Sequence, residues 1–129
     1  MSTIRVLVVE DSAAFRQYIC QTLAKSSGLQ VVGEVSDGLE AVQSALALKP
    51  DLILLDIGLP SLDGIKAARR IRSVAPESKI IFVSQETSPE LMEEALGLGA
   101  VGYVVKARAL HDLLPAIEAV VLGRQFVSV

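Results

Sequence analysis

Five polar side chains that together suit phosphoryl chemistry each follow a short apolar run of the sequence. Glu10 and Asp11 follow the run at 4–9, Asp56 follows 52–55, Ser84 follows 80–83 and Lys106 follows 103–105. A group of carboxylates suits a hard divalent cation, and Mg²⁺ is favoured because it keeps coordination positions for water and phosphate. A carboxylate beside such a cation, a lysine and a hydroxyl is suited to attack phosphorus, since the positive charges stabilise the transferred oxygens.

Each of these residues has a plainer interpretation when it is taken alone. An aspartate at the end of a strand is usually a turn or cap residue, and a single lysine is usually a solvated surface charge. The combination of residue types at all four run ends favours a phosphoacceptor site. Neither the single histidine nor the single cysteine stands at these positions, so zinc is not indicated.

The apolar runs that precede these residues predict the strands of a parallel sheet. They are unbroken and rich in β-branched residues, which is typical of strands buried on both faces. A fifth run, at 29–35, is interrupted by Gly33 and Glu34, which indicates an edge strand. After the last predicted helix only residues 123–129 remain.

The segments between the runs carry apolar residues at helical spacing, which predicts one helix after each strand. The apolar positions are Phe15, Ile19 and Leu23; Leu39, Val42 and Leu46; Ile65, Ala68 and Ile71; Leu91, Ala95 and Leu98; and Leu110, Leu113, Ile117 and Val120. Ser12 and Ser88 are the expected N-caps of the first and fourth helices, and Pro89 suits a first helical position.

Five strand–helix units in strict alternation predict an α/β fold, a doubly wound five-stranded parallel sheet with helices on both faces. In the flavodoxin-like strand order 2-1-3-4-5 the first and third strands are neighbours, and ligands bind beyond the carboxyl ends of the strands. The three carboxylates that follow these two strands should therefore converge. Two carboxylates about 5 Å apart repel by roughly 3 kcal/mol at an effective dielectric constant of about 20, so a compensating cation is expected.

Composition limits the remaining possibilities. The chain of 129 residues, 51% hydrophobic, is the size of one domain, which we place at 1–129. The net charge of −3 and the absence of a Lys/Arg run argue against direct nucleic-acid binding by this domain. A single cysteine excludes a disulfide framework and suits the reducing cytoplasm. The longest uncharged stretch, 95–105, is too short to span a membrane.

Four segments resemble the receiver domain of two-component response regulators. They are Val-Leu-Val-Val-Glu-Asp at 6–11, Leu-Leu-Asp-Ile-Gly-Leu-Pro-Ser-Leu-Asp-Gly at 54–64, Ile-Ile-Phe-Val-Ser at 80–84 and Gly-Ala-Val-Gly-Tyr-Val-Val-Lys at 99–106. The resemblance covers about 4–122, and the second and fourth segments are highly specific in combination. Residues 56–72 and the closing Gly-Arg-Gln-Phe-Val-Ser at 123–128 are most similar to receivers of the LuxR/NarL-type transcriptional regulators.

The resemblance implies a role for each residue of the carboxylate cluster. Asp56 would be the phosphoacceptor, phosphorylated by a sensor histidine kinase. Glu10, Asp11, Asp56 and the backbone carbonyl of Gly58 would hold Mg²⁺, and Lys106 would contact the phosphoryl group.

It also implies that Ser84 and Tyr103 are the switch residues. In the family the hydroxyl moves toward the phosphate and the aromatic ring turns inward, which biases a surface formed by the fourth helix, the fifth strand and the fifth helix. The domain would thus be a signalling module and not an enzyme, although it assists its own phosphorylation and dephosphorylation. It would control transcription through a DNA-binding domain outside this chain, and homodimerisation is a further expectation.

The sequence departs from the family pattern at three positions. Ala107 stands where many members have a proline preceded by a cis peptide, so a cis bond is not expected here. Gln85 follows Ser84 where a small residue is common, which would narrow access to the phosphoryl group. Gly58 places no side chain two residues past Asp56, where dephosphorylation is commonly tuned, so a less shielded phosphoryl group is expected.

Three other functions remain as alternatives. A pseudo-receiver would act as an interaction module without phosphorylation, which the intact set of Asp56, Ser84 and Lys106 argues against. An aspartate-nucleophile phosphohydrolase usually has Asp-x-Asp after the first strand, but Ala13 stands two residues past Asp11. A carrier of flavin mononucleotide needs a phosphate loop of Ser, Thr or Gly after the first strand, where this chain has acids.

Several further features carry no chemistry in our interpretation. Residues 97–102 match a dinucleotide-binding glycine pattern but should end a helix and precede a strand, which is the wrong context. His111 is expected to be exposed and Cys20 to be packed. The arginines at 69, 70 and 72 are expected on or near the solvated side of the third helix.

Overall fold

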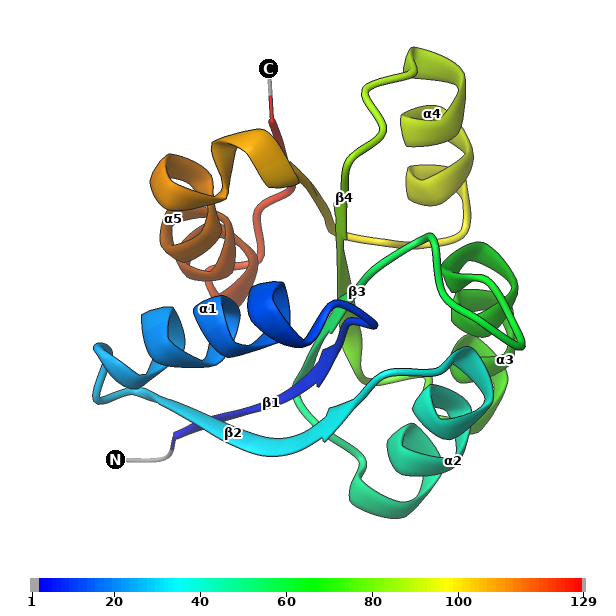
Figure 1. The fold of residues 1–129 in the computed structure, drawn as a ribbon, viewed down its shortest axis with the longest axis horizontal. Helices are drawn as coiled ribbons and strands as arrows, with labels where there is room; N and C mark the ends of the chain where they lie inside the picture. Colours follow the sequence, from blue (N-terminus) through cyan, green and yellow to red (C-terminus); the bar gives the residue numbers. More distant parts are fainter. Residues whose placement is uncertain (1–2, 129) are drawn as a thin grey trace.

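Six parallel strands form one sheet in the computed structural model, which describes residues 3–128 (Figure 1). The spatial order is β2-β1-β3-β4-β5-β6, so the predicted order 2-1-3-4-5 is present with one strand added. The strands are β1 (Ile4–Val9), β2 (Leu29–Val35), β3 (Leu52–Leu55), β4 (Lys79–Ser84), β5 (Gly102–Val105) and β6 (Phe126–Val127). As expected, β2 lies at an edge of the sheet, and its register against β1 shifts between Val6 and Leu7.

The expectation of a five-stranded sheet was therefore incomplete. The chain turns back after the fifth helix, and β6 pairs in parallel with β5, Gly102 opposite Phe126 and Tyr103 opposite Val127. Phe126 donates its backbone N–H to the carbonyl of Val101, and Ser128 donates to the carbonyl of Tyr103. Two residues are too few to show a strand period, so this strand exists only through its pairing with β5.

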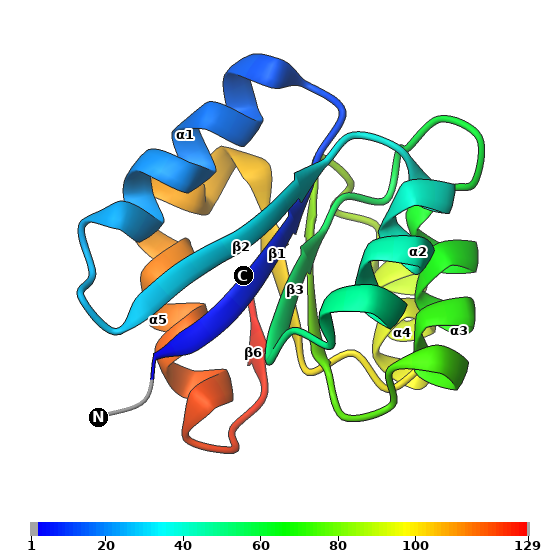
Figure 2. The same cartoon turned by 90° about the horizontal axis from the view of Figure 1, so that it is seen from below.

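Five helices cover the two faces of the sheet, as the spacing of apolar residues predicts (Figure 2). They are α1 (Ala13–Ala24), α2 (Gly38–Leu48), α3 (Gly64–Val74), α4 (Pro89–Gly97) and α5 (Ala109–Val121), and a 3₁₀ turn, η1 (Lys106–Arg108), precedes α5. The Ser12 hydroxyl accepts from the amide of Phe15, and the Ser88 hydroxyl accepts from the amide of Leu91. Both predicted N-caps are confirmed.

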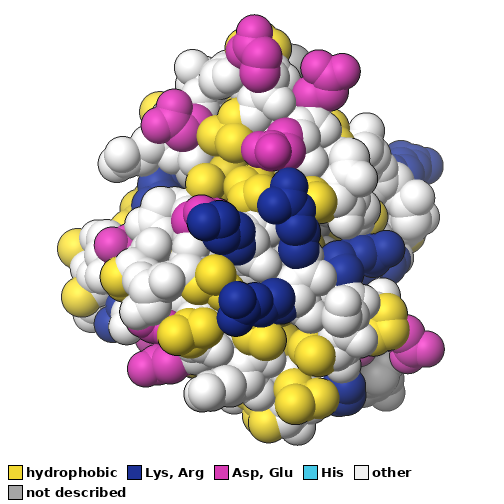
Figure 3. Space-filling view, turned by 90° about the vertical axis from the view of Figure 1, so that its right-hand side faces the viewer, with side chains coloured by type: hydrophobic (Ala, Val, Ile, Leu, Met, Phe, Trp, Pro, Cys, Tyr) yellow, Lys and Arg dark blue, Asp and Glu magenta, His cyan; other side chains and the backbone are white. Residues whose placement is uncertain are grey.

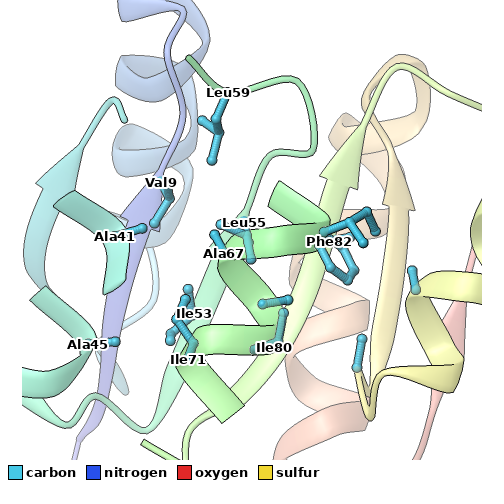
Figure 4. Packing of buried hydrophobic residues seen from close by; sticks show 14 of the residues in the cluster. Val9, Ala41, Ala45, Ile53, Leu55, Leu59, Ala67, Ile71, Ile80 and Phe82 are labelled. Atoms are coloured by element: carbon cyan, nitrogen blue, oxygen red, sulfur yellow. The ribbon is translucent and has the colours of Figure 1, made fainter. Parts of the chain in front are cut away.

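Strand side chains alternate between two buried clusters. One face packs against α2, α3 and α4, where Leu55 and Phe82 of the sheet meet Ala67 and Ile71 of α3 (Figure 4). The other face packs against α1 and α5. Burial of a leucine or phenylalanine side chain contributes about 1.5–3 kcal/mol, so both faces stabilise the sheet that positions the strand ends.

The remaining expectations about the surface are also met. Residues 69, 70 and 72 of α3 are exposed arginines, and basic side chains gather below acidic ones on the side of the molecule that carries α3 and α4 (Figure 3). His111 is exposed and Cys20 is partly buried.

The glycine pattern at 97–102 does not lie in the context of a dinucleotide-binding loop, because Gly97 ends α4 and Gly102 begins β5. Within residues 3–128 no helix has the length and apolarity needed to cross a membrane.

Candidate functional site

Three carboxylates converge at the carboxyl ends of β1 and β3, as the sequence predicts. The two strands are paired with Val9 opposite Leu55, so the residues that follow them, Glu10 and Asp56, lie side by side. Ligand atoms of Glu10, Asp11 and Asp56 all lie within 4.8 Å of one another. Glu10 and Asp56 are 1% and 5% exposed, whereas Asp11 is open to solvent.

Lys106 supplies the positive charge of the site. Its Nζ atom lies 2.7 Å from Oε1 of Glu10 and 3.4 Å from Oδ2 of Asp56. The ammonium also lies 4.9 Å from the centroid of the Phe15 ring, which is within the range of a cation–π contact. One lysine thus joins the two buried carboxylates, and α1 contributes an aromatic ring that helps to place it.

The two carboxylate oxygens of Glu10 have different surroundings. Oε2 accepts the backbone N–H of Ser12 at 2.9 Å. Oε1 is buried and faces the Lys106 ammonium at 2.7 Å, and no other donor among the described residues contacts it. An acceptor with a lone pair left over, next to two further carboxylates, fits a divalent cation bound through oxygen ligands.

Burial and charge shift the protonation of both partners of this ion pair. Burial raises the pKa of Glu10, the charge of Asp56 raises it further, and Lys106 and the Ser12 amide oppose the shift without cancelling it. Burial by itself would lower the pKa of Lys106, but the hydrogen bond to Glu10 and the charges of Asp56 and Glu10 raise it overall. Both shifts indicate that the site favours additional positive charge.

A cavity of about 340 Å³ opens above these residues. Its lining comes from the carboxyl ends of four strands and the residues that follow them: Glu10, Asp11, Ser12, Asp56, Ile57, Gly58, Ser84, Gln85, Glu86 and Lys106. Ser84 is buried, and its hydroxyl accepts the backbone N–H of Glu86 at 3.1 Å. Gln85 is exposed at the cavity wall, which is consistent with its expected position beside the access route.

Two glycines shape the loop that follows Asp56. The N–H of Gly58 donates to Oδ1 of Asp56 at 3.3 Å, and no atom lies within 4 Å of the place where a Cβ on Gly58 would be. Gly64, the first residue of α3, is tightly enclosed, since a Cβ there would lie 2.1 Å from the carbonyl oxygen of Asp56. The first glycine leaves the site open, and the second allows α3 to approach the backbone of Asp56.

Tyr103 lies inside the protein. The side chain is fully buried, its ring centroid is 6.4 Å from that of Phe82, and its hydroxyl donates to the carbonyl of Glu86 at 3.0 Å. Burial raises the pKa of the phenol. Ser84 and Tyr103 are therefore both hydrogen-bonded to the backbone of Glu86.

Sequence reasoning missed three residues that lie next to the site. Arg16 donates from Nη1 to the carbonyl of Glu10 at 2.8 Å. Asp112 and Ser128, both largely buried, form a hydrogen bond next to the end of β5. An arginine one turn into a helix has no distinctive signal, and Ser128 is brought beside Val105 only by the pairing of β6 with β5.

No cis peptide bond occurs among the described residues, and Lys106 begins η1 directly after β5. A doubly wound sheet that bears three carboxylates and a lysine at the carboxyl ends of its strands has the architecture of a signalling receiver domain. Residues 6–118 match the family model of the response regulator receiver domain. The chain belongs to this family.

Individual relatives have the same domain within longer proteins. The response regulator GacA of Pseudomonas viridiflava is 36% identical over 125 residues, which cover 97% of this chain and 58% of that protein. The transcriptional regulatory protein PdtaR of Mycobacterium tuberculosis (strain CDC 1551 / Oshkosh) is 41% identical over 119 residues, 91% of this chain and 56% of that protein. This chain thus spans less than two thirds of either relative.

Solved structures show the same fold. The crystal structure of a two-component response regulator of the LuxR family from Aurantimonas sp. SI85-9A1 has a TM-score of 0.92 and 31% identity. The match covers 97% of this chain and 89% of that one.

Proposed function

We propose that Asp56 is the phosphoacceptor of this receiver domain and that a histidine kinase supplies the phosphoryl group. The observation that carries the proposal is the contact of one ammonium, that of Lys106, with both buried carboxylates, Glu10 and Asp56. An aspartate that only forms a turn does not require a paired cation. An aspartate that receives a phosphoryl group requires positive charge near the transferred oxygens.

The reaction follows from the position of Asp56 in the cavity. A carboxylate oxygen of Asp56 attacks the phosphorus of a phosphohistidine, a P–O bond forms, and the P–N bond breaks. The histidine nitrogen leaves with the bonding electron pair and takes a proton from water. Lys106 stabilises the charge on the transferred oxygens, and most of the catalysis is positioning.

Glu10, Asp11, Asp56 and the backbone carbonyl of Gly58 are the proposed ligands of Mg²⁺. The oxygen-only donor set and the lone pair that Lys106 leaves free on Oε1 of Glu10 support this choice. When bound, the cation would offset negative charge on the carboxylates and on the phosphoryl oxygens. The lysine alone cannot neutralise three carboxylates, so a bound cation would complete the charge balance of the site.

The switch is proposed to act through the backbone of Glu86. Ser84 accepts its N–H and Tyr103 donates to its carbonyl, so a movement of the Ser84 hydroxyl toward a phosphoryl group would break one of two bonds that hold this residue. The Tyr103 ring is already inside the protein, so the hydroxyl contact, and not a large ring rotation, is the element that phosphorylation would change.

We place the domain at 1–129 in a cytoplasmic regulator of the LuxR/NarL type that controls transcription through a DNA-binding domain. The LuxR-family structure and the two longer regulators support this placement. The domain itself would act as a signalling module rather than as an enzyme and would not bind nucleic acid directly. Homodimerisation remains part of the proposal.

The test is incubation of the protein with Mg²⁺ and acetyl phosphate, followed by intact mass measurement. We expect a gain of one phosphoryl group, and no gain in Asp56→Asn. Asp51→Asn, a change of the same type at the opposite end of the sheet, should behave as wild type. Equal phosphorylation of Asp56→Asn would refute the acceptor, and a wild-type protein that never gains the group would favour a pseudo-receiver.

The open surroundings of Gly58 lead to a proposal about phosphoryl lifetime. With no side chain at this position, water should reach the phosphoryl group readily. Substitution of Gly58 by a larger polar residue should change the half-life of the phosphorylated domain without unfolding it, because the added atoms enter free space. An unchanged half-life of the phosphorylated domain across several such variants would refute the proposal that Gly58 leaves the phosphoryl group open to water.

A further inference from the structure

Asp112 of α5 forms a small buried network at the outer edge of β5. Its Oδ2 atom accepts the hydroxyl of Ser128 at 2.7 Å and Nε of Arg108 at 3.1 Å. The Ser128 hydroxyl in turn accepts the backbone N–H of Val105 at 3.1 Å. Asp112 and Ser128 are 8% and 4% exposed, so the two bonds of the Ser128 hydroxyl are shielded from water, whereas the Arg108 side chain is exposed. We call Arg108, Asp112 and Ser128 the Asp112 network.

The network contacts the chain on both sides of Lys106, through the backbone of Val105 and through the side chain of Arg108. Val105, the last residue of β5, is fixed on one side by its pairing opposite Ser84 in β4 and on the other by Ser128. Arg108, two residues past Lys106, is bound to the same carboxylate. The intervening residues 106–108 form a single 3₁₀ turn, so the direction of the Lys106 side chain depends on how its two ends are held.

The residue after Lys106 gives no rigidity of its own. Ala107 is exposed, and alanine leaves φ free, whereas a proline would restrict it to about −65°. The Lys106 ammonium must nevertheless reach Glu10 and Asp56 from the neighbouring strands at 2.7 and 3.4 Å. A small angular change at the base of a long side chain displaces its end by a large distance. The hydrogen bond that fixes the backbone of Val105 therefore affects the position of the Lys106 ammonium.

We propose that Asp112 and Ser128 are positioning residues that hold Lys106 in the geometry needed for phosphorylation of Asp56. The inference rests on the proposed function. Both residues act through the backbone of Val105 and contact no reacting atom. Ser128 reaches this position because β6 runs parallel to β5, which brings the chain back to the end of the sheet where the carboxylates lie.

The structure offers a matched control for a substitution of Ser128. Ser78 is equally buried, at 4% exposure, and its hydroxyl donates to the carbonyl of Pro50 at the opposite end of the sheet. Ser78→Ala and Ser128→Ala therefore each remove one buried serine hydroxyl, but only the second is connected to Lys106. A general effect of lost stability should appear in both variants.

The experiment measures the rate of phosphorylation by acetyl phosphate with Mg²⁺. Ser128→Ala should be slowed about tenfold, Ser78→Ala should stay within about twofold of wild type, and Ser128→Thr, which keeps the hydroxyl, should recover much of the rate. In a Lys106→Ala background Ser128→Ala should have no further effect, because two residues that act through one contact are not additive.

A second measurement in the unphosphorylated protein follows amide hydrogen exchange at Val105. Ser128→Ala should accelerate it while Ser78→Ala does not, which shows directly that the network has been opened. A Ser128→Ala variant with fast exchange and a wild-type rate of phosphorylation would overturn the inference. So would equal slowing in the presence and absence of Lys106. A wild-type protein that is never phosphorylated would instead refute the proposed function itself, and the positioning role would fall with it.

Discussion

Replacement of Lys106 by methionine tests the electrostatic account of the site. Methionine keeps most of the length of the side chain but removes the charge that pairs with Glu10 and Asp56. Glu10 is then a buried carboxylate without a cation, and breaking a buried pair in this way commonly costs 3–5 kcal/mol. We expect a loss of folding stability that depends on pH.

Protonation limits the size of the loss. A unit charge pair at 2.7 Å attracts by about 6 kcal/mol at an effective dielectric constant of about 20, but Glu10 can bind a proton instead of losing that full amount. From its ordinary pKa of 4.5, protonation costs about 1.4 kcal/mol per pH unit. The part of the loss that comes from a charged Glu10 is thus limited to about 1.4 kcal/mol near pH 5.5 and about 4 kcal/mol near pH 7.5.

The sign of the pH dependence follows from linkage. Burial already raises the pKa of Glu10, and removal of the lysine should raise it further above the value in the unfolded chain. An acid with a raised pKa in the folded state favours folding below its unfolded pKa, and this advantage is lost as pH rises through the folded-state pKa. The deficit of Lys106→Met relative to wild type should therefore grow as pH rises from about 4.5.

The assay is urea unfolding of both proteins with EDTA at about pH 5.5, 6.5 and 7.5. Lys66→Met, on the exposed side of α3, is the control and should match wild type at each pH. Subtraction of the wild-type curve removes titrations that the two proteins share. A deficit that is the same at all three pH values, or larger at the lowest, would refute the reasoning.

Other substitutions separate steric, metal and thiol effects. Gly64→Ala should lower the free energy of unfolding in urea by about 1–3 kcal/mol, because its Cβ would lie 2.1 Å from the carbonyl oxygen of Asp56. Gly97→Ala, whose Cβ enters open space, should be neutral or stabilise by up to about 1 kcal/mol. Mg²⁺ at about 100 times its Kd for the wild-type protein should raise the free energy of unfolding by about 2.7 kcal/mol. An equal gain in Asp11→Asn at the same Mg²⁺ concentration would exclude that carboxylate as a ligand. Burial raises the pKa of the Cys20 thiol to about 11, so alkylation by iodoacetamide near pH 8 should be about hundredfold slower than that of free cysteine; a similar rate would contradict this.

The sheet and the carboxylate cluster could be predicted because both depend on patterns that are local in sequence. The unbroken runs at 4–9 and 52–55 coincide with β1 and β3, since a strand buried on both faces needs apolar residues at every position. The parallel topology then places the residues after these strands at the same end of the sheet, where the carboxyl ends of the strands lie. Glu10 and Asp56 meet there without any further information.

The parts that could not be predicted depend on contacts between distant residues. Two residues in β6 have no period of their own, and Ser128 gains its role only when this strand pairs with β5. The shift of register between β1 and β2 likewise has no sequence signal beyond Gly33, where a Cβ would lie 3.0 Å from a methyl group of Leu7. Such features arise from tertiary packing and not from local preference.

Strand β6 has a consequence for the behaviour of the protein at high concentration. Without it, β5 would be an edge strand with unpaired backbone groups beside apolar side chains, and such an edge is a template for pairing with another molecule. The opposite edge, β2, has no partner strand beyond β1 but exposes Gln30 and Glu34 and carries an irregular register. One edge of the sheet thus ends in a strand of only two residues, which offers little backbone for pairing, and the other is protected by polar side chains and irregularity. Two residues near the end of the chain thereby protect the protein against edge-to-edge aggregation.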